Sequence, residues 1–167
     1  MSATLERPPS ANEGIKTRSN FLRGTIADGL SRLETGDMAA DDQQLVKFHG
    51  MYVQDDRDLR AERGKQKMEK AFIFMVRLRV PAGILTPTQW LAAENVARQR
   101  GNGTLRLTTR QTIQFHGIIK TNVRPAIQEL HRELLDTIAA CGDVNRNVVA
   151  AVHPWAGHLH NEVAEIG

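Results

Sequence analysis

The stretch from Phe72 to Val80 constrains the fold most, because apolar side chains occupy every second position and arginines occupy two of the positions between them. Every second residue is apolar, from Phe72 through Val76 to Val80, and the intervening positions include Arg77 and Arg79. A period of two residues is typical of a β-strand with one face in a core and the other outside it. The segment therefore predicts a strand that presents arginines on the face turned away from the core.

The segments that follow predict a regular order of elements. Thr86 has the features of a helix N-cap, with Pro87 in the first turn and Gln89 three residues after the cap. This helix is expected to end at Arg100. After it we expect two strands, at 104–108 and 112–120, then a helix from 122 to about 141 and a fourth strand at 145–152. The order β-α-β-β-α-β predicts an α+β, ferredoxin-like half-domain over 71–152, whose helices cover one sheet face and leave the other open.

The remaining residues predict flanking segments around this unit. Residues 1–42 are expected to form an N-terminal arm, extended over its first part and with a short helix near 25–33. Residues 43–70 are dense in charges of both signs and are expected to form a charged linker that includes a solvated helix. Residues 153–167 are expected to be the start of a further segment.

Composition narrows the class of protein. The 167 residues are 41% hydrophobic and 25% charged, which is typical of one globular domain. No apolar run is long enough to span a membrane, and the N-terminus lacks the apolar stretch of a signal peptide. The single cysteine, Cys141, excludes a multi-cysteine metal site within the chain, and we expect a reducing, cytoplasmic setting.

The open face of the predicted sheet concentrates positive charge. The chain has 16 Arg against 6 Lys, and alternation places arginines and hydrogen-bonding side chains on one face or beside it: Arg77, Arg79, Arg106, Thr108, Arg110, Thr112, Gln114, His116 and Arg146. No acidic residue occurs in 77–80 or 104–120, so an anionic ligand is expected there.

Three interpretations of this face remain open from the residues alone. A cationic face can simply meet water, as open antiparallel faces often do. It can bind RNA, but RNA platforms carry exposed aromatics, whereas Phe72, Phe74 and Phe115 fall on the apolar side. It can also bind a cofactor that carries many carboxylates, which matches the guanidinium-rich pattern best.

Three motifs in order along the chain point to one family. They are the segments LVKFHGMYVQDDRD (45–58), GTLRLTTRQTIQFHG (103–117) and CGDVNRNV (141–148). Together they resemble the N-terminal part of the nitrite/sulfite reductase family, and within it the haemoprotein beta component of assimilatory sulfite reductases. The resemblance runs from about Leu45 to Val152.

The resemblance implies an activity and a set of site residues. These enzymes reduce sulfite to sulfide with six electrons at a sirohaem, which bears eight carboxylates, coupled to a [4Fe–4S] cluster. By motif position, the sirohaem-contacting residues would be Arg77, Arg106, Thr108, Arg110, Gln114, His116, Asn145 and Arg146. Arg77 and Arg146 would also take a catalytic role by binding the sulfite oxyanion.

The chain also departs from the family pattern. The family's cluster is held by four cysteines in a C-terminal half, and Cys141 cannot replace them. We therefore expect a fragment that is inactive alone and needs the C-terminal half and an electron donor, either a flavoprotein or ferredoxin. Nucleic-acid and membrane partners are not expected. The alternative function is a stand-alone anion- or RNA-binding module of the same fold.

Overall fold

The computed structural model describes residues 8–142, 144–151 and 158–166. Its helices are α1 (Ala11–Arg18), α2 (Ile26–Ser31), α3 (Ala40–Leu45), the 3₁₀ helices η1 (Val46–His49) and η2 (Pro81–Gly83), α4 (Arg57–Lys65), α5 (Pro87–Arg100), α6 (Lys120–Arg132) and α7 (His158–Ile166). Its strands are β1 (Met51–Asp55), β2 (Phe72–Arg77), β3 (Leu105–Leu107) and β4 (Ile113–Ile118). None of the helices among the described residues is long and apolar enough to cross a membrane.

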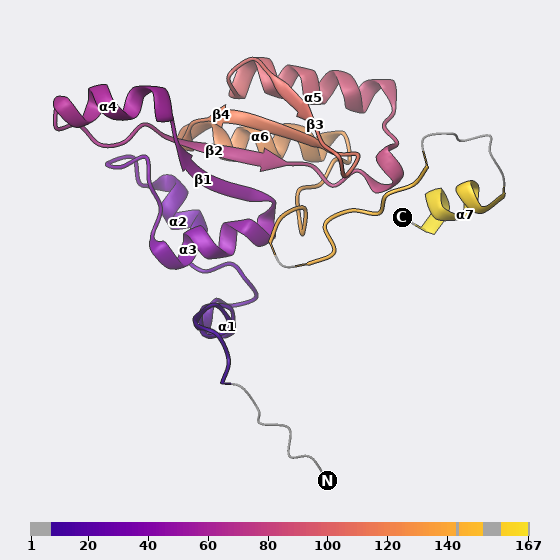
Figure 1. The fold of residues 1–167 in the computed structure, drawn as a ribbon, viewed down its shortest axis with the longest axis horizontal. Coiled ribbons are helices and arrows are strands. Elements are labelled where there is room, and N and C mark those ends of the chain that lie inside the picture. Colours follow the sequence, from indigo (N-terminus) through magenta and orange to yellow (C-terminus); the bar gives the residue numbers. More distant parts are fainter. Residues whose placement is uncertain (1–7, 143, 152–157, 167) are drawn as a thin grey trace, which may run out of the picture.

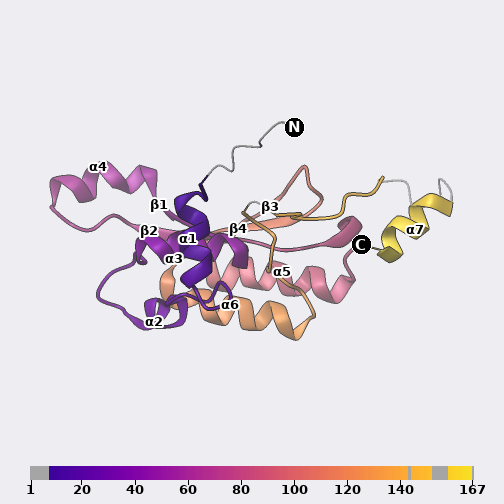
Figure 2. The ribbon, with the colours of Figure 1, turned by 90° about the horizontal axis from the view of Figure 1, so that it is seen from below.

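The four strands form one antiparallel sheet in the order β1-β2-β4-β3. Helices α5 and α6 lie side by side against one face of this sheet (Figures 1 and 2). Val76, Phe115 and Ile118 are fully buried beneath them, together with Val96 and Leu130 of the two helices. The predicted fold class, α+β with a ferredoxin-like sheet, is confirmed.

The strand at the β1 edge differs from the sequence-based expectation. A fourth strand was expected at 145–152, but residues 144–151 form no strand, and the edge position beside β2 is taken by β1. Met51 pairs with Val76 and Asp55 pairs with Phe72 in an antiparallel register. β1 lies inside the segment expected to be a charged linker. Only Met51 of its five residues is buried, so the strand has little of the apolar alternation that would predict it.

Helix α6 ends earlier than expected, because the residue after its last turn, Leu134, has a left-handed backbone conformation. Leu134 has φ +57°, and the backbone N–H of Leu134 donates to His131 O (3.1 Å), while that of Leu135 donates to Leu130 O (3.0 Å). This pair of bonds is a Schellman motif, which usually has glycine at the left-handed position. The motif ends the helix, so an irregular loop follows Arg132 in place of the expected helix to about 141. Because leucine stands where glycine is usual, the sequence carries no signal for this end.

The arm and the linker contain more helix than expected. Ala11–Arg18, expected to be extended, forms α1, and the Lys16 ammonium lies 4.9 Å from the centre of the Phe48 ring. Buried Asp42 accepts hydrogen bonds from the Thr25 N–H (2.9 Å) and hydroxyl (2.6 Å), which ties α3 to the start of α2. In the linker, α4 is the expected solvated helix, and Arg60 pairs with Asp55 at 2.6 Å.

Candidate functional site

Three polar side chains form a row across the sheet on the face opposite α5 and α6. Arg77 of β2 pairs with Gln114 of β4, which pairs in turn with Arg106 of β3. Their neighbours Val76 and Phe115 are buried in the core, so alternation directs the row to the other face. With its amide oriented toward Arg77, the Gln114 oxygen accepts hydrogen bonds from Nε (3.0 Å) and Nη2 of the guanidinium.

His116 extends this row along β4, and a bulge positions it. Phe74 pairs with Ile118 and Val76 with Phe115, so His116 and Gly117 together oppose one residue of β2. Because of the bulge, Phe115 and Ile118 both reach the core although they are three positions apart, and His116 stays on the polar face. Gly117 has φ +72°, and a Cβ there would lie 2.7 Å from the Cβ of Asn102.

The surroundings of the His116 imidazole favour its neutral form. Burial lowers its pKa below the ordinary value of 6.5, and the positive charges of Arg106 and Arg77 lower the pKa further. Its Nε2 atom is buried and has no hydrogen-bond partner among the described residues. A buried nitrogen without a partner is unfavourable, so a ligand that reaches Nε2 would gain a hydrogen bond there.

The loop that follows α6 closes one side of the row. Arg77 Nη1 donates to Ala140 O at 3.4 Å, and Arg146 Nε donates to Gly142 O at 3.0 Å. The thiol of Cys141 is fully buried between them: burial raises its pKa, while the charges of Arg77 and Arg146 oppose that rise. Arg77 and Arg146, far apart in sequence, therefore lie around the same short segment.

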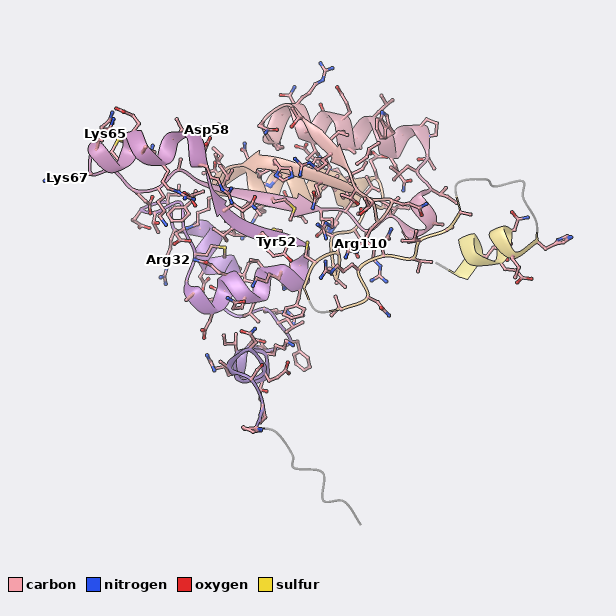
Figure 3. All side chains as sticks on the ribbon, in the orientation of Figure 1. Arg32, Tyr52, Asp58, Lys65, Lys67 and Arg110 are labelled. Carbon is pink, nitrogen blue, oxygen red and sulfur yellow. The ribbon has the colours of Figure 1, made fainter. Side chains whose placement is uncertain are left out.

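Arg110 and Thr108 belong to the turn between β3 and β4. The Thr108 hydroxyl oxygen accepts from the N–H of Arg110 (3.3 Å) and of Thr112 (3.4 Å), so it stabilises the turn. The Arg110 side chain is exposed, and Figure 3 shows it beside the segment that contains residues 144–151. That closeness is fixed by a hydrogen bond from Asn147 Nδ2 to Arg110 O at 2.8 Å.

The structure thus brings most of the sequence-predicted site residues together. Arg77, Arg106, Gln114 and His116 share one face, Arg146 reaches it from the loop, and Arg110 with Thr108 borders it. Asn145 is exposed on the segment that leads to Arg146. Sequence analysis missed Asn147 and the carbonyls of Ala140 and Gly142, since hydrogen bonds to backbone atoms leave no pattern of residue types.

The electrostatics of the site favour an anion. Within residues 8–142, 144–151 and 158–166, none of Arg77, Arg106, Arg110 and Arg146 forms an ion pair with a carboxylate. Permanently charged guanidiniums that lack an internal counterion repel each other, and a bound anion would relieve that repulsion. The described part of the chain contains no group of His, Cys, Asp and Glu side chains that could hold a metal ion.

A cavity adjoins the β3–β4 turn that contains Thr108. It has a volume of about 750 Å³ and is lined by apolar side chains that include Val80, Ile84, Trp90 and Leu107. Its mostly apolar lining, which also includes Thr108 of that turn, suits an apolar contact better than a polyanion.

Comparisons with known proteins agree with this arrangement. Residues 65–133 match the family model of the nitrite/sulfite reductase ferredoxin-like half domain. The chain is 63% identical over 157 residues to the sulfite reductase [NADPH] hemoprotein beta-component of Methylobacterium nodulans, covering 94% of this chain and 26% of that protein. It is 55% identical over 160 residues to the beta-component of Shouchella clausii, covering 96% of this chain and 28% of that protein.

A solved structure shows the same fold. The NirA protein of Mycobacterium tuberculosis superimposes with a TM-score of 0.70 at 25% identity, over 90% of this chain and 28% of that chain. Residues 65–133 therefore resemble a nitrite/sulfite reductase ferredoxin-like half domain in sequence, and the fold agrees with that resemblance. The chain is a relative of the sulfite reductase haemoprotein beta-components and spans about a quarter of the length of the Methylobacterium nodulans and Shouchella clausii proteins.

Proposed function

We propose that this chain forms the N-terminal part of a sulfite reductase and holds the carboxylates of a sirohaem on its arginine-bearing face. The observation that carries the proposal is the row Arg77–Gln114–Arg106, extended by His116 and by Arg146 from the loop. The donor set fits a polycarboxylate: among the described residues, four arginines have no carboxylate partner and the buried Nε2 of His116 has no hydrogen-bond partner.

Each group has a defined part in this proposal. Arg106 and Arg110 would grip carboxylates as two-pronged donors, and Gln114 would orient the Arg77 guanidinium. His116 would donate from Nε2 once a carboxylate raises its pKa. Asn145 and Thr108 would contribute polar atoms at the rim. When bound, sirohaem with its coupled [4Fe–4S] cluster would pass electrons from the external donor to sulfite.

Arg77 and Arg146 would also bind the substrate. Both lie around the buried Cys141 segment, so their charges act on the same region. Fixed positive charge in a site that excludes water stabilises an oxyanion as negative charge develops on it. The cluster ligands, the remaining substrate contacts and the contacts to a flavoprotein or ferredoxin donor would come from outside these 167 residues, since the chain has one cysteine.

The alternative, an RNA-binding module, has less support. Stacking platforms need exposed aromatic rings on the open face, but Phe74 and Phe115 are fully buried on the helix side. The two functions separate in a binding test with uroporphyrin, an iron-free tetrapyrrole with eight carboxylates. We expect saturable uroporphyrin binding that is weakened in Arg77→Ala and Arg146→Ala. Absent uroporphyrin binding together with tight, steeply salt-dependent binding of single-stranded RNA would overturn the proposal.

A chimera tests the activity. This chain replaces the matching segment of the Methylobacterium nodulans beta-component, to which it is 63% identical. We expect the chimera to retain sirohaem absorbance and sulfite-dependent electron uptake. Arg146→Ala in the chimera should lose turnover. A chimera that carries sirohaem but is unaffected by Arg77→Ala and Arg146→Ala would show that these arginines have no role in the reaction.

A further inference from the structure

Asn147 connects two segments that carry site arginines. Its Oδ1 accepts from Val80 N at 3.1 Å, and its Nδ2 donates to Val80 O at 2.7 Å and to Arg110 O at 2.8 Å. The side chain thus satisfies both backbone groups of Val80, which follows Arg77 by three residues, and holds the β3–β4 turn at the same time.

Two further contacts strengthen this junction. Ala82 N donates to Val148 O at 2.9 Å, and the Gln111 amide exchanges two hydrogen bonds with the backbone of Ala150, at 2.6 Å and 2.9 Å. These bonds explain why 144–151 is held in place without forming a strand: side-chain amides make the contacts that ladder bonds would otherwise make. Asn147 is the point at which the end of β2, the turn and the loop meet.

The position requires a neutral residue. Arg110 is bonded to Asn147 through its carbonyl, and Arg146 directly precedes Asn147 in the chain. A carboxylate at position 147 could pair with nearby guanidiniums that an anionic ligand needs, and it could not donate a hydrogen bond to the carbonyls of Val80 and Arg110. An amide supplies both a donor and an acceptor without adding charge.

We propose that Asn147 is a positioning residue, which holds Arg110 and Arg146 in register with the strand of Arg77 so that the three guanidiniums engage one polyanion together. The inference rests on the proposed function, because it concerns the same anion site. Among the described residues, the side chain of Asn147 forms hydrogen bonds with backbone atoms only, so it would act on the ligand through the arginines.

The test compares Asn147→Ala with a matched control. Asn122→Ala also removes an asparagine whose Nδ2 donates to a backbone carbonyl, that of Arg100 at 3.1 Å, but on the helix side of the sheet. Uroporphyrin is titrated into the 167-residue chain and each variant, below their melting temperatures. We expect Asn147→Ala to weaken binding about tenfold, as the loss of an outer supporting contact typically does. Asn122→Ala should stay within about twofold of the unchanged chain.

A double-mutant cycle separates positioning from general destabilisation. In an Arg110→Ala background, Asn147→Ala should have a smaller effect, because one of the arginines that it positions is already gone. The salt dependence of binding should also fall in Asn147→Ala although no charge is removed, since fewer guanidiniums reach the ligand. Additive effects with an unchanged salt dependence would overturn the inference.

A folding defect and a failure of the site give different results. If Asn147→Ala does not fold, Asn147→Ser is measured by the same criteria. The serine hydroxyl is too short to hydrogen-bond to both Val80 and Arg110. Binding equal to that of the unchanged chain would then overturn the inference. If Arg77→Ala weakens uroporphyrin binding and Asn147→Ala does not, the positioning role fails alone. If neither Arg77→Ala nor Arg146→Ala weakens uroporphyrin binding, the proposed site itself fails.

Discussion

The guanidinium of Arg77 and the side-chain amide of Gln114 lie opposite each other on β2 and β4 and are joined by two hydrogen bonds to the Gln114 oxygen. Gln114 is 8% exposed, so this is a nearly buried contact of a permanent charge with a neutral acceptor. A neutral acceptor fixes the direction of the guanidinium but leaves its charge uncompensated. The pair therefore keeps Arg77 available for an anion.

Replacing Gln114 with glutamate should move stability and binding in opposite directions. The new carboxylate would pair with Arg77, so the melting temperature should be kept or raised, while the affinity for uroporphyrin should fall about tenfold or more. Gln54→Glu is the matched control, because Gln54 is exposed and lies on the same sheet face at the β1 edge. Equal losses of affinity in both variants would mean that only net charge matters and that the Arg77–Gln114 pair has no special role.

Replacing Arg110 with lysine should weaken uroporphyrin binding several-fold and leave the melting temperature unchanged. The side chain is exposed and its hydrogen bond to Asn147 uses the backbone carbonyl, so folding does not depend on the guanidinium. A lysine keeps the charge but cannot make a two-pronged contact with a carboxylate. Titration and a thermal melt measure the two effects. Arg98→Lys, on the exposed side of α5, should bind like the unchanged chain; if Arg110→Lys does too, Arg110 makes no direct carboxylate contact.

Much of the site was predictable from the sequence because strand alternation is a strong pattern. The period of two over 72–80 and over 112–120 placed Arg77, Gln114 and His116 on one face, and the register confirms that Arg77 and Gln114 are direct neighbours. The element order placed Arg110 beside that face in the expected turn and Arg146 at the start of an expected strand, and the structure replaces that strand with a loop. Alternation alone says nothing about residues in turns and loops.

Other features could not be predicted for identifiable physical reasons. The end of α6 depends on Leu134 in a left-handed conformation, where the usual signal would be glycine. The strand β1 has only one fully buried residue, so its apolar alternation is weak. The role of Asn147 depends on backbone carbonyls of distant residues, and every residue type presents the same carbonyl.

The stability of the ligand-free chain should fall as the pH drops below about 6.5, and His116 should account for part of the fall. The pKa of His116 is lower in the folded chain than its ordinary value of 6.5, so the unfolded state takes up the proton first. The stability that neutral His116 contributes is therefore complete above pH 6.5 and is lost as the pH falls through 6.5 toward the folded-state pKa. Thermal melts of the unchanged chain and of His116→Gln at several pH values isolate the part of the stability loss that is due to His116. The other histidines contribute equally to both proteins.

Uroporphyrin binding should show the reverse dependence on pH. A carboxylate near Nε2 favours the protonated imidazole, so binding takes up a proton and affinity should rise from pH 7.5 to about pH 6. His116→Gln should remove this rise. An affinity that is flat over the same range in the unchanged chain would show that His116 takes up no proton when the ligand binds.

A polyanion should stabilise the folded chain through the arginines that lack a counterion. Binding to the folded state alone adds about 2.7 kcal/mol at a free ligand concentration one hundred times Kd. For a domain of this size, each kcal/mol corresponds to about 2–4 °C in melting temperature. We therefore expect saturating uroporphyrin to raise the melting temperature by about 5–10 °C at constant ionic strength.

The salt dependence of the melts completes this prediction. Added sodium chloride should raise the melting temperature of the ligand-free chain, because screening weakens the repulsion among Arg77, Arg106, Arg110 and Arg146. The same salt should reduce the shift caused by uroporphyrin, since screening also weakens the attraction of the arginines for its carboxylates. In a chain with both Arg77→Ala and Arg146→Ala, the ligand shift should largely disappear. A high melting temperature that neither salt nor uroporphyrin changes would show that the cationic face is relaxed without an anion, and the reason to assign it a polycarboxylate ligand would then be lost.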